Sequence, residues 1–177
     1  MNRVTSTDYD SPVGPVLLTF VDDALVRLDV AHEGLDRARA EIAARLGVAP
    51  DPDPAPGADL VRQLDEYFDG ARQAFDVPLD WRLVRGFPRA ALEATLEIPY
   101  GETAAYGEVA VMAGAPGAAR AVGTACASSP FSIVVPVHRV VRADGSIGEY
   151  GGHPEVKRHL LGIEGAVRAA GGLRAAG

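Results

Sequence analysis

The chain has 177 residues, of which 47% are hydrophobic and 23% charged, and its formal net charge is −7. This length and composition fit one or two small domains with a buried core and argue against an intrinsically disordered chain. The first twenty residues hold no basic segment followed by an apolar run, and no stretch of eighteen apolar residues occurs. The sequence therefore predicts a cytoplasmic protein with no secretion signal and no membrane partner.

The chain has too few cysteines and histidines for an internal disulfide bond or a zinc site. Cys126 is the one cysteine, so it has no partner for an internal disulfide, and the four histidines show no zinc-ligand spacing. The sequence predicts neither a bound metal nor a cofactor.

The negative charge lies in the first half of the chain. Residues 1–85 carry nine arginines against 16 acidic residues, whereas residues 86–177 carry eight basic and eight acidic residues. A nucleic acid is therefore expected to bind the second half, through few phosphate contacts.

Apolar patterning along the first half alternates between strand and helix types. Residues 9–30 predict strands with turns at 11–14 and near 22–23, which form a hairpin or a meander. Helical spacing of apolar residues follows at 35–46 and again at 58–68.

Two further segments complete this half. Residues 49–57 contain four prolines in seven positions, which is typical of a stiff, extended surface connector. A short strand is expected at 75–79.

The second half is mostly helical. Pro88 suits the first turn of a helix over residues 89–96, and Thr103 can cap a helix over 104–113. Residues 114–117, Gly-Ala-Pro-Gly, break that helix before another at 118–128. This spacing is typical of a helix-turn-helix, although two short helices joined by a tight turn are also common in proteins that do not bind DNA.

These elements predict an α/β protein of two domains. Residues 1–85 form a small N-terminal sheet-plus-helix domain, and residues 86–177 form a mostly helical C-terminal domain with the helix-turn-helix.

The most informative motif is Pro-Val-His-Arg-Val at residues 136–140. With its flanks, over 133–145, it resembles the active-site strand of the O6-alkylguanine-DNA alkyltransferases, in which Pro-Cys-His-Arg-Val supplies a sacrificial thiol. Similarity in order and spacing extends over about the last ninety residues, at 98–103, 106–110, 119–123, 145–152 and 157–164. The first 85 residues resemble the family's more variable amino-terminal domain, less specifically.

The resemblance implies how the protein meets double-stranded DNA containing O6-alkylguanine. Residues 118–128 match a recognition helix that enters the minor groove, with Ala119 and Ala121 flanking Arg120. Arg120 matches the arginine that fills the gap left by a rotated nucleotide, and Tyr106 matches the tyrosine that contacts the flipped base. The alternatives are a solvated helix charge for Arg120 and a core aromatic for Tyr106.

The resemblance also implies a base pocket. Main-chain groups of Val137, Val140, Tyr150 and Gly151 are expected to read the base, with Tyr150 as an apolar wall and Cys126 on the alkyl side. Cys126 is the one conceivable surrogate acceptor, but a free cysteine is more often a small buried apolar residue.

The reactive atom of the family is missing from this pocket. His138 and Glu164 match the pair that draws a proton from the family's cysteine, but Val137 has no lone pair and no titratable proton. They are a remnant of the transferase site, no catalytic residue is expected, and Arg139 is expected to be a structural ion-pair partner.

Ser129 is a second departure, because the family usually has Asn before the following proline. The two changes together favour a natural non-transferring relative over a single engineered Cys-to-Val substitution.

The sequence therefore predicts an alkyltransferase-like protein that is not an enzyme. It would flip and hold O6-alkylguanine as a monomer, and would protect the lesion or flag it for nucleotide excision repair proteins. Two alternatives stay open: an enzyme that acts on a small molecule in the former pocket, and an inactivated alkyltransferase, for example an engineered variant.

Overall fold

The computed structural model describes residues 2–165, 167–168 and 172–173. The chain divides into two compact units, one of Met1–Leu83 with Pro130–Val134, the other of Val84–Ser129 with Val135–Gly177. The first unit contains, in chain order, β1 (Val4–Ser11), β2 (Gly14–Val21), β3 (Ala24–Val30), α1 (Leu35–Leu46), β4 (Asp51–Pro52), α2 (Ala58–Phe68) and a 3-10 turn, η1 (Trp81–Leu83).

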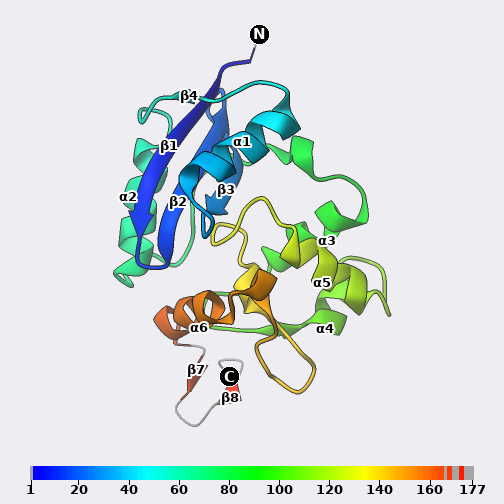
Figure 1. The fold of residues 1–177 in the computed structure, drawn as a ribbon. Coiled ribbons are helices and arrows are strands. Elements are labelled where there is room, and N and C mark those ends of the chain that lie inside the picture. The colour runs from blue at the N-terminus through cyan, green and yellow to red at the C-terminus, as the bar shows by residue number, and fades with distance from the viewer. Residues whose placement is uncertain (1, 166, 169–171, 174–177) are drawn as a thin grey trace. The chain divides into compact units, whose positions relative to one another are not determined.

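The first three strands form the expected meander within a sheet of order β3-β2-β1-β4 (Figure 1). β1 and β2 pair antiparallel over their full lengths, from Val4 opposite Val21 to Ser11 opposite Gly14. β1 begins five residues earlier than expected. Its first half, Thr5 to Thr7, consists of hydroxyl residues that are buried, so apolar alternation could not reveal it.

Two connecting segments differ from the sequence prediction. The proline-rich segment is more than a connector, because Asp51 and Pro52 pair parallel with Thr5 and Ser6 as β4, at the sheet edge where proline's missing N–H is tolerated. The strand expected at residues 75–79 is absent apart from an isolated bridge between Leu79 and Leu25.

Within residues 75–79, the side chain of Gln63 supplies the hydrogen bonds that a neighbouring strand would otherwise make. The Gln63 amide donates to the Asp76 carbonyl at 2.9 Å and accepts from the Asp76 N–H at 2.7 Å. Both backbone groups are therefore satisfied without a neighbouring strand.

The two helices of this unit have the predicted bounds and cover opposite faces of the sheet (Figure 1). Ala38 and Ile42 of α1 pack in one cluster with Leu17. On the other face, the Tyr9 hydroxyl donates to Asp65 of α2 at 2.8 Å. Tyr9 pairs with Val16 rather than Leu17, and successive strand residues point to opposite faces.

The second unit is mostly helical (Figure 1). It contains α3 (Phe87–Thr95), β5 (Ala104–Ala105), α4 (Tyr106–Met112), α5 (Ala119–Ala127), η2 (Val137–Arg139), β6 (Val140–Val141), η3 (Tyr150–Gly152), α6 (Pro154–Ile163), β7 (Val167–Arg168) and β8 (Gly172–Leu173). This arrangement confirms the predicted α/β class and the helical C-terminal region.

Helices α4 and α5 form the helix-turn-helix, and their turn contains Gly114 and Gly117, both at positive φ. α4 begins two residues later than predicted, and Thr103 does not cap it. Residues 104–105 pair as a strand instead, and the Ala105 N–H donates to the Glu108 carboxylate at 2.6 Å.

The segment that was expected to be the active-site strand is mainly a turn. The Arg139 N–H donates to the Pro136 carbonyl at 2.9 Å, which winds residues 137–139 into η2. Only Val140 and Val141 continue as strand, parallel to β5, which leads directly into α4. This ladder ties the start of the helix-turn-helix to the motif.

Among residues 2–165, 167–168 and 172–173, no helix is long and apolar enough to cross a bilayer.

Candidate functional site: a pocket behind the helix-turn-helix

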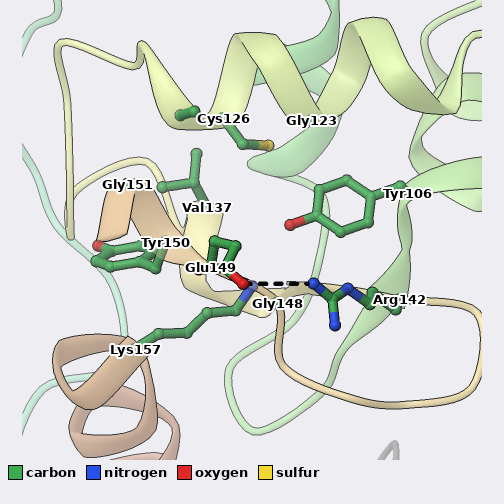
Figure 2. Close-up of a pocket in the computed structure, with 11 residues that line it drawn as sticks. Tyr106, Gly123, Cys126, Val137, Arg142, Gly148, Glu149, Tyr150, Gly151 and Lys157 are labelled. Atoms are coloured by element: carbon green, nitrogen blue, oxygen red, sulfur yellow. Dashed lines mark ion pairs between the residues drawn. The ribbon is translucent and has the colours of Figure 1, made fainter. Parts of the chain in front are cut away.

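A cavity of about 170 Å³ opens between α4, α5, α6 and the loop after β6. It is lined by Tyr106, Gly123, Cys126, Ala127, Val137, Arg142, Gly148, Glu149, Tyr150, Gly151 and Lys157. Figure 2 shows Cys126 and Val137 facing the same hollow, with Tyr106 and Tyr150 on either side. This volume is far larger than the volume that one water molecule needs, so the cavity can hold a small organic group.

A buried ionic cluster stands beside Val137. The neutral His138 ring donates through Nε2 to Glu164 Oε1 at 2.8 Å, since a carboxylate can only accept. Arg139 donates to both oxygens of Glu164, at 2.8 and 3.0 Å, and to the Ile98 carbonyl at 2.7 Å. The expected structural role of Arg139 is confirmed.

This cluster sets the ionisation of its members. Burial raises the pKa of Glu164, but the hydrogen bonds and charges of His138 and Arg139 outweigh burial and lower that pKa to about 2. Burial lowers the pKa of His138, and the bond to Glu164 opposes this shift only in part. At neutral pH the pair is a carboxylate and a neutral imidazole, and the basic nitrogen of His138 is Nδ1.

Cys126 reaches the cavity from α5 but is a poor nucleophile. Burial raises the pKa of its thiol to about 11, although the neighbouring Lys157 lowers it in part. The thiolate is the reactive form, so almost all of this sulfur is unreactive at neutral pH.

Lys157 lines the cavity, although the sequence analysis did not assign it to the pocket. It is 1% exposed, and its Nζ donates to the Val140 carbonyl. Burial lowers the pKa of Lys157 to about 8, and the Arg142 charge adds to that shift.

The loop that follows β6 closes one side of the cavity. Arg142 and Glu149 form an ion pair at 3.7 Å, drawn as a dashed line in Figure 2. Gly148 has φ +75°, and a Cβ there would lie 3.3 Å from the Tyr106 hydroxyl. Burial raises the pKa of Tyr106, whose ring also lies 3.8 Å from the position of a Gly123 Cβ.

The residues expected to meet DNA lie on the outer side of α5. Arg120 and Ala121 are exposed, and Ala119 is partly exposed. Tyr106, at the start of α4, lines the cavity and also packs against the apolar core of α3, α4 and α5.

The structure brings together Tyr106, Cys126, Val137, Tyr150 and Gly151. Val140, also expected there, does not line the cavity: its side chain is fully buried in the α3, α4 and α5 core, and its carbonyl points to Lys157. His138 and Glu164 form their pair but lie outside the lining.

The pocket residues missed from the sequence are mainly Arg142, Gly148, Glu149 and Lys157. Lys157 could have been found, because Leu160 and Leu161, three and four residues on, define the buried stripe of α6. A lysine on such a stripe is rarely buried without a reason.

No cluster of three or more His, Cys, Asp or Glu side chains suited to a metal ion occurs in the part of the chain that the structure describes.

The site therefore combines a helix-turn-helix with a partly open pocket, an arrangement that suits a protein that reads or modifies DNA. Residues 4–81 match the model of the 6-O-methylguanine DNA methyltransferase ribonuclease-like domain, and residues 86–166 match the model of its DNA binding domain. The chain belongs to the O6-methylguanine DNA methyltransferase family.

Individual relatives agree with this assignment. The chain is 42% identical to the methylated-DNA–protein-cysteine methyltransferase of Mycobacterium bovis over 155 residues, which cover 88% of each protein. It is 36% identical to that of Methanosarcina barkeri over 162 residues, covering 88% of this chain and 93% of the relative.

Solved structures are similar over nearly the whole chain. The Mycobacterium tuberculosis O6-methylguanine methyltransferase has a TM-score of 0.79 and 40% identity, covering 94% of this chain and 96% of that one. The OGT of the same organism in complex with DNA has a TM-score of 0.76 and 40% identity, with 92% of each chain covered.

Proposed function

We propose that this protein recognises O6-alkylguanine in double-stranded DNA, rotates it into the pocket and holds it without removing the alkyl group. The observation that carries the proposal is Val137. It lines the pocket beside an intact His138–Glu164 pair, at the position where the family motif has its acceptor cysteine.

Chemistry supports binding over transfer. An alkyl carbon can move only to an atom with a lone pair, and the Val137 side chain has none. The pocket's one thiol, Cys126, is held protonated by burial. A protein that holds the lesion without repairing it protects it or flags it, and we assign the hand-over to nucleotide excision repair proteins, with this protein acting as a cytoplasmic monomer.

The exposed face of α5 supports DNA contact. Arg120 lies on its solvent side and can supply a planar cation where the extruded base leaves a gap. Extruding a base costs a few kcal/mol, and less for a lesion that pairs poorly. Lesion binding should therefore gain both from the easier extrusion and from the pocket contacts.

Two duplexes that differ by one O6-methylguanine test this function. The modified duplex should bind more tightly, the label of a labelled methyl group should stay on the DNA, and the protein mass should not change. Equal affinities would overturn lesion recognition. A stoichiometric gain of one methyl group on Cys126 would identify a surrogate transferase.

Arg120→Ala tests how the base is held. The variant should lose the unstacking signal of a fluorescent base analogue placed at the lesion, because the cation that fills the gap is gone. Arg89→Ala is the matched control: Arg89 is a half-exposed arginine on α3, paired with Glu93. Equal signals from the two variants would make Arg120 a solvated charge only.

The preserved His138–Glu164 geometry favours one second candidate, a transferase inactivated at residue 137. Val137→Cys would place a thiol beside this pair, and slow methyl transfer should appear, since Ser129 stands where the family usually has Asn. A folded Val137→Cys protein that binds the lesion but stays inert would exclude this candidate. Turnover of a small molecule that depends on His138, with no lesion binding, would favour an enzyme instead.

A further inference from the structure

Arg142 and Glu149 form the charged mouth of the pocket. Both side chains line the cavity, yet 54% of the Arg142 side chain and 80% of the Glu149 side chain are exposed to solvent. Lys157 also lines the cavity, but its side chain is buried. A ligand that arrives from solvent therefore meets the charges of Arg142 and Glu149 first.

The ion pair at the mouth is weak. Arg142 Nη2 and Glu149 Oε1 are 3.7 Å apart, along the dashed line in Figure 2. An exposed pair of this kind contributes little to stability. A guanidinium can bond a phosphate through two parallel N–H groups, which is a stronger contact. A phosphate at the mouth can therefore take the place of Glu149 beside Arg142.

The backbone holds Arg142 at this place. Its N–H donates to the Ser146 carbonyl at 2.9 Å, and its carbonyl accepts from the Gly145 N–H at 2.9 Å, which closes a tight turn. A Cβ on Gly148 would meet both the Tyr106 hydroxyl, at 3.3 Å, and Arg142 Nε, at 4.0 Å. The guanidinium therefore stands next to Tyr106, and a change of partner requires only rotation of the Arg142 side chain.

A base inside the cavity would bring phosphates to the mouth. A nucleotide that is rotated out of the stack keeps its bonds to the DNA backbone, so the phosphates on either side of it stay outside the pocket. Glu149 repels such phosphates, whereas Arg142 attracts them.

We propose that Arg142 is a phosphate-binding residue at the mouth of the pocket: when a lesion enters, its guanidinium leaves Glu149 and binds a phosphodiester group next to the rotated nucleotide. The inference rests on the proposed function, because a phosphate reaches the mouth only if a nucleotide is rotated into the cavity. DNA whose bases stay stacked does not make this contact, so Arg142 favours the lesion over guanine.

One such contact matters in a unit with little positive charge. Residues 86–177 are neutral in sum. Arg139 is buried against Glu164, and Arg89 is paired with Glu93. A single guanidinium that changes partner on binding is therefore a large share of the charge that this unit can offer to DNA.

The experiment measures the ratio of affinities for O6-methylguanine and guanine duplexes at about 50 and about 200 mM salt. Contacts that both duplexes share cancel in this ratio. One additional phosphate contact in the lesion complex should make the wild-type ratio fall by about threefold to fourfold over this range. Arg142→Gln should lower the ratio by about fivefold to tenfold at the lower salt concentration, and should abolish its dependence on salt.

Two further variants separate direct binding from neutralisation of Glu149. Arg89→Gln is the matched control, since Arg89 is also a half-exposed arginine paired with a glutamate, and it should behave like wild type. Arg142→Gln/Glu149→Gln removes both charges of the mouth. Its ratio should recover in part, because the repulsion by Glu149 is gone, but it should stay independent of salt.

The outcomes distinguish the inference from the proposed function. If the ratio of Arg142→Gln falls with salt as much as the wild-type ratio, or if Arg142→Gln/Glu149→Gln behaves like wild type, Arg142 does not bind phosphate and the inference is wrong while the proposed function stands. If wild type binds both duplexes equally at both salt concentrations, the proposed function itself fails.

Discussion

The buried carboxylate of Glu164 accepts hydrogen bonds from two neighbouring side chains, His138 and Arg139. One oxygen accepts from His138 and from Arg139, and the other accepts from Arg139, whose guanidinium also stacks 5.7 Å from the Tyr100 ring centroid. These contacts hold η2 against the end of α6. The cluster therefore supports the pocket wall whether or not residue 137 can react.

Glu164→Gln should destabilise the protein by about 3–5 kcal/mol, because it leaves the buried Arg139 charge without its counter-ion. Urea unfolding measures this loss. Glu93→Gln is the control, since Glu93 forms an exposed pair with Arg89 and should change stability little. Equal small losses for both variants would show that Arg139 does not depend on Glu164.

Acid should weaken the fold in two stages. Folding lowers the pKa of both His138 and Glu164, so the unfolded chain takes up each proton first. The free energy of unfolding should fall as the pH drops below about 6.5 for His138, and again between 4.5 and about 2 for Glu164. Urea titrations of wild type and His138→Gln check this. An unchanged pH slope below 6.5 in the variant would contradict it.

At the scale of elements, the loop after β6 depends on Gly148. Its φ of +75° lies in the left-handed region, and an added Cβ would press on the Tyr106 hydroxyl. Glycine at that position therefore lets the loop lie this close to α4 without backbone strain or a shift of Tyr106.

Gly148→Ala should lower stability by about 1–2 kcal/mol from backbone strain and should also reduce the lesion-to-guanine affinity ratio, because Tyr106 must shift. Gly152→Ala is matched for strain, with φ +87°, but its Cβ would meet nothing within 4 Å. It should lose similar stability and keep the ratio. A preserved ratio in Gly148→Ala would mean that Tyr106 tolerates the shift.

Elements long enough to show a periodic pattern of apolar residues could be predicted from the sequence. The bounds of α1 and α2 were correct, and α5 was correct to one residue at each end. The two-residue strands β4, β5 and β6 could not be predicted, since so short a strand shows no period and exists only through its partner.

The pocket residues also divide into those that could be predicted from the sequence and those that could not. Its residues from the motif and the helix-turn-helix were anticipated through the family resemblance, whereas Arg142 and Glu149 join it only because their loop folds back. The resemblance predicts a pocket role for the main chain of Val140, and the structure adds that its side chain packs in the core.

At the scale of the whole molecule, charge limits how DNA can be held. The net charge is −7, and residues 86–177 are neutral in sum. Recognition should therefore depend on the pocket and on a few phosphate contacts, without a broad basic surface.

The salt dependence of binding tests this. The logarithm of the binding constant for unmodified duplex should fall against the logarithm of salt concentration with a slope no steeper than about −4, which corresponds to roughly four phosphates. Fluorescence anisotropy at several salt concentrations measures the slope. A slope of about −7 would require a cationic surface that the charge distribution does not supply.

The segment Pro130–Val134 belongs to the first compact unit although it lies nearly fifty residues beyond Leu83 in the sequence. Its Phe131 ring is fully buried and packs edge-on against Trp81 at 4.9 Å, and the Leu28 N–H donates to the Pro130 carbonyl. On a ribosome, the amino-terminal unit therefore lacks part of its core until α3, α4 and α5 have also been synthesised. A fragment ending near residue 85 would therefore lack Phe131, the aromatic residue that packs against Trp81 in this unit.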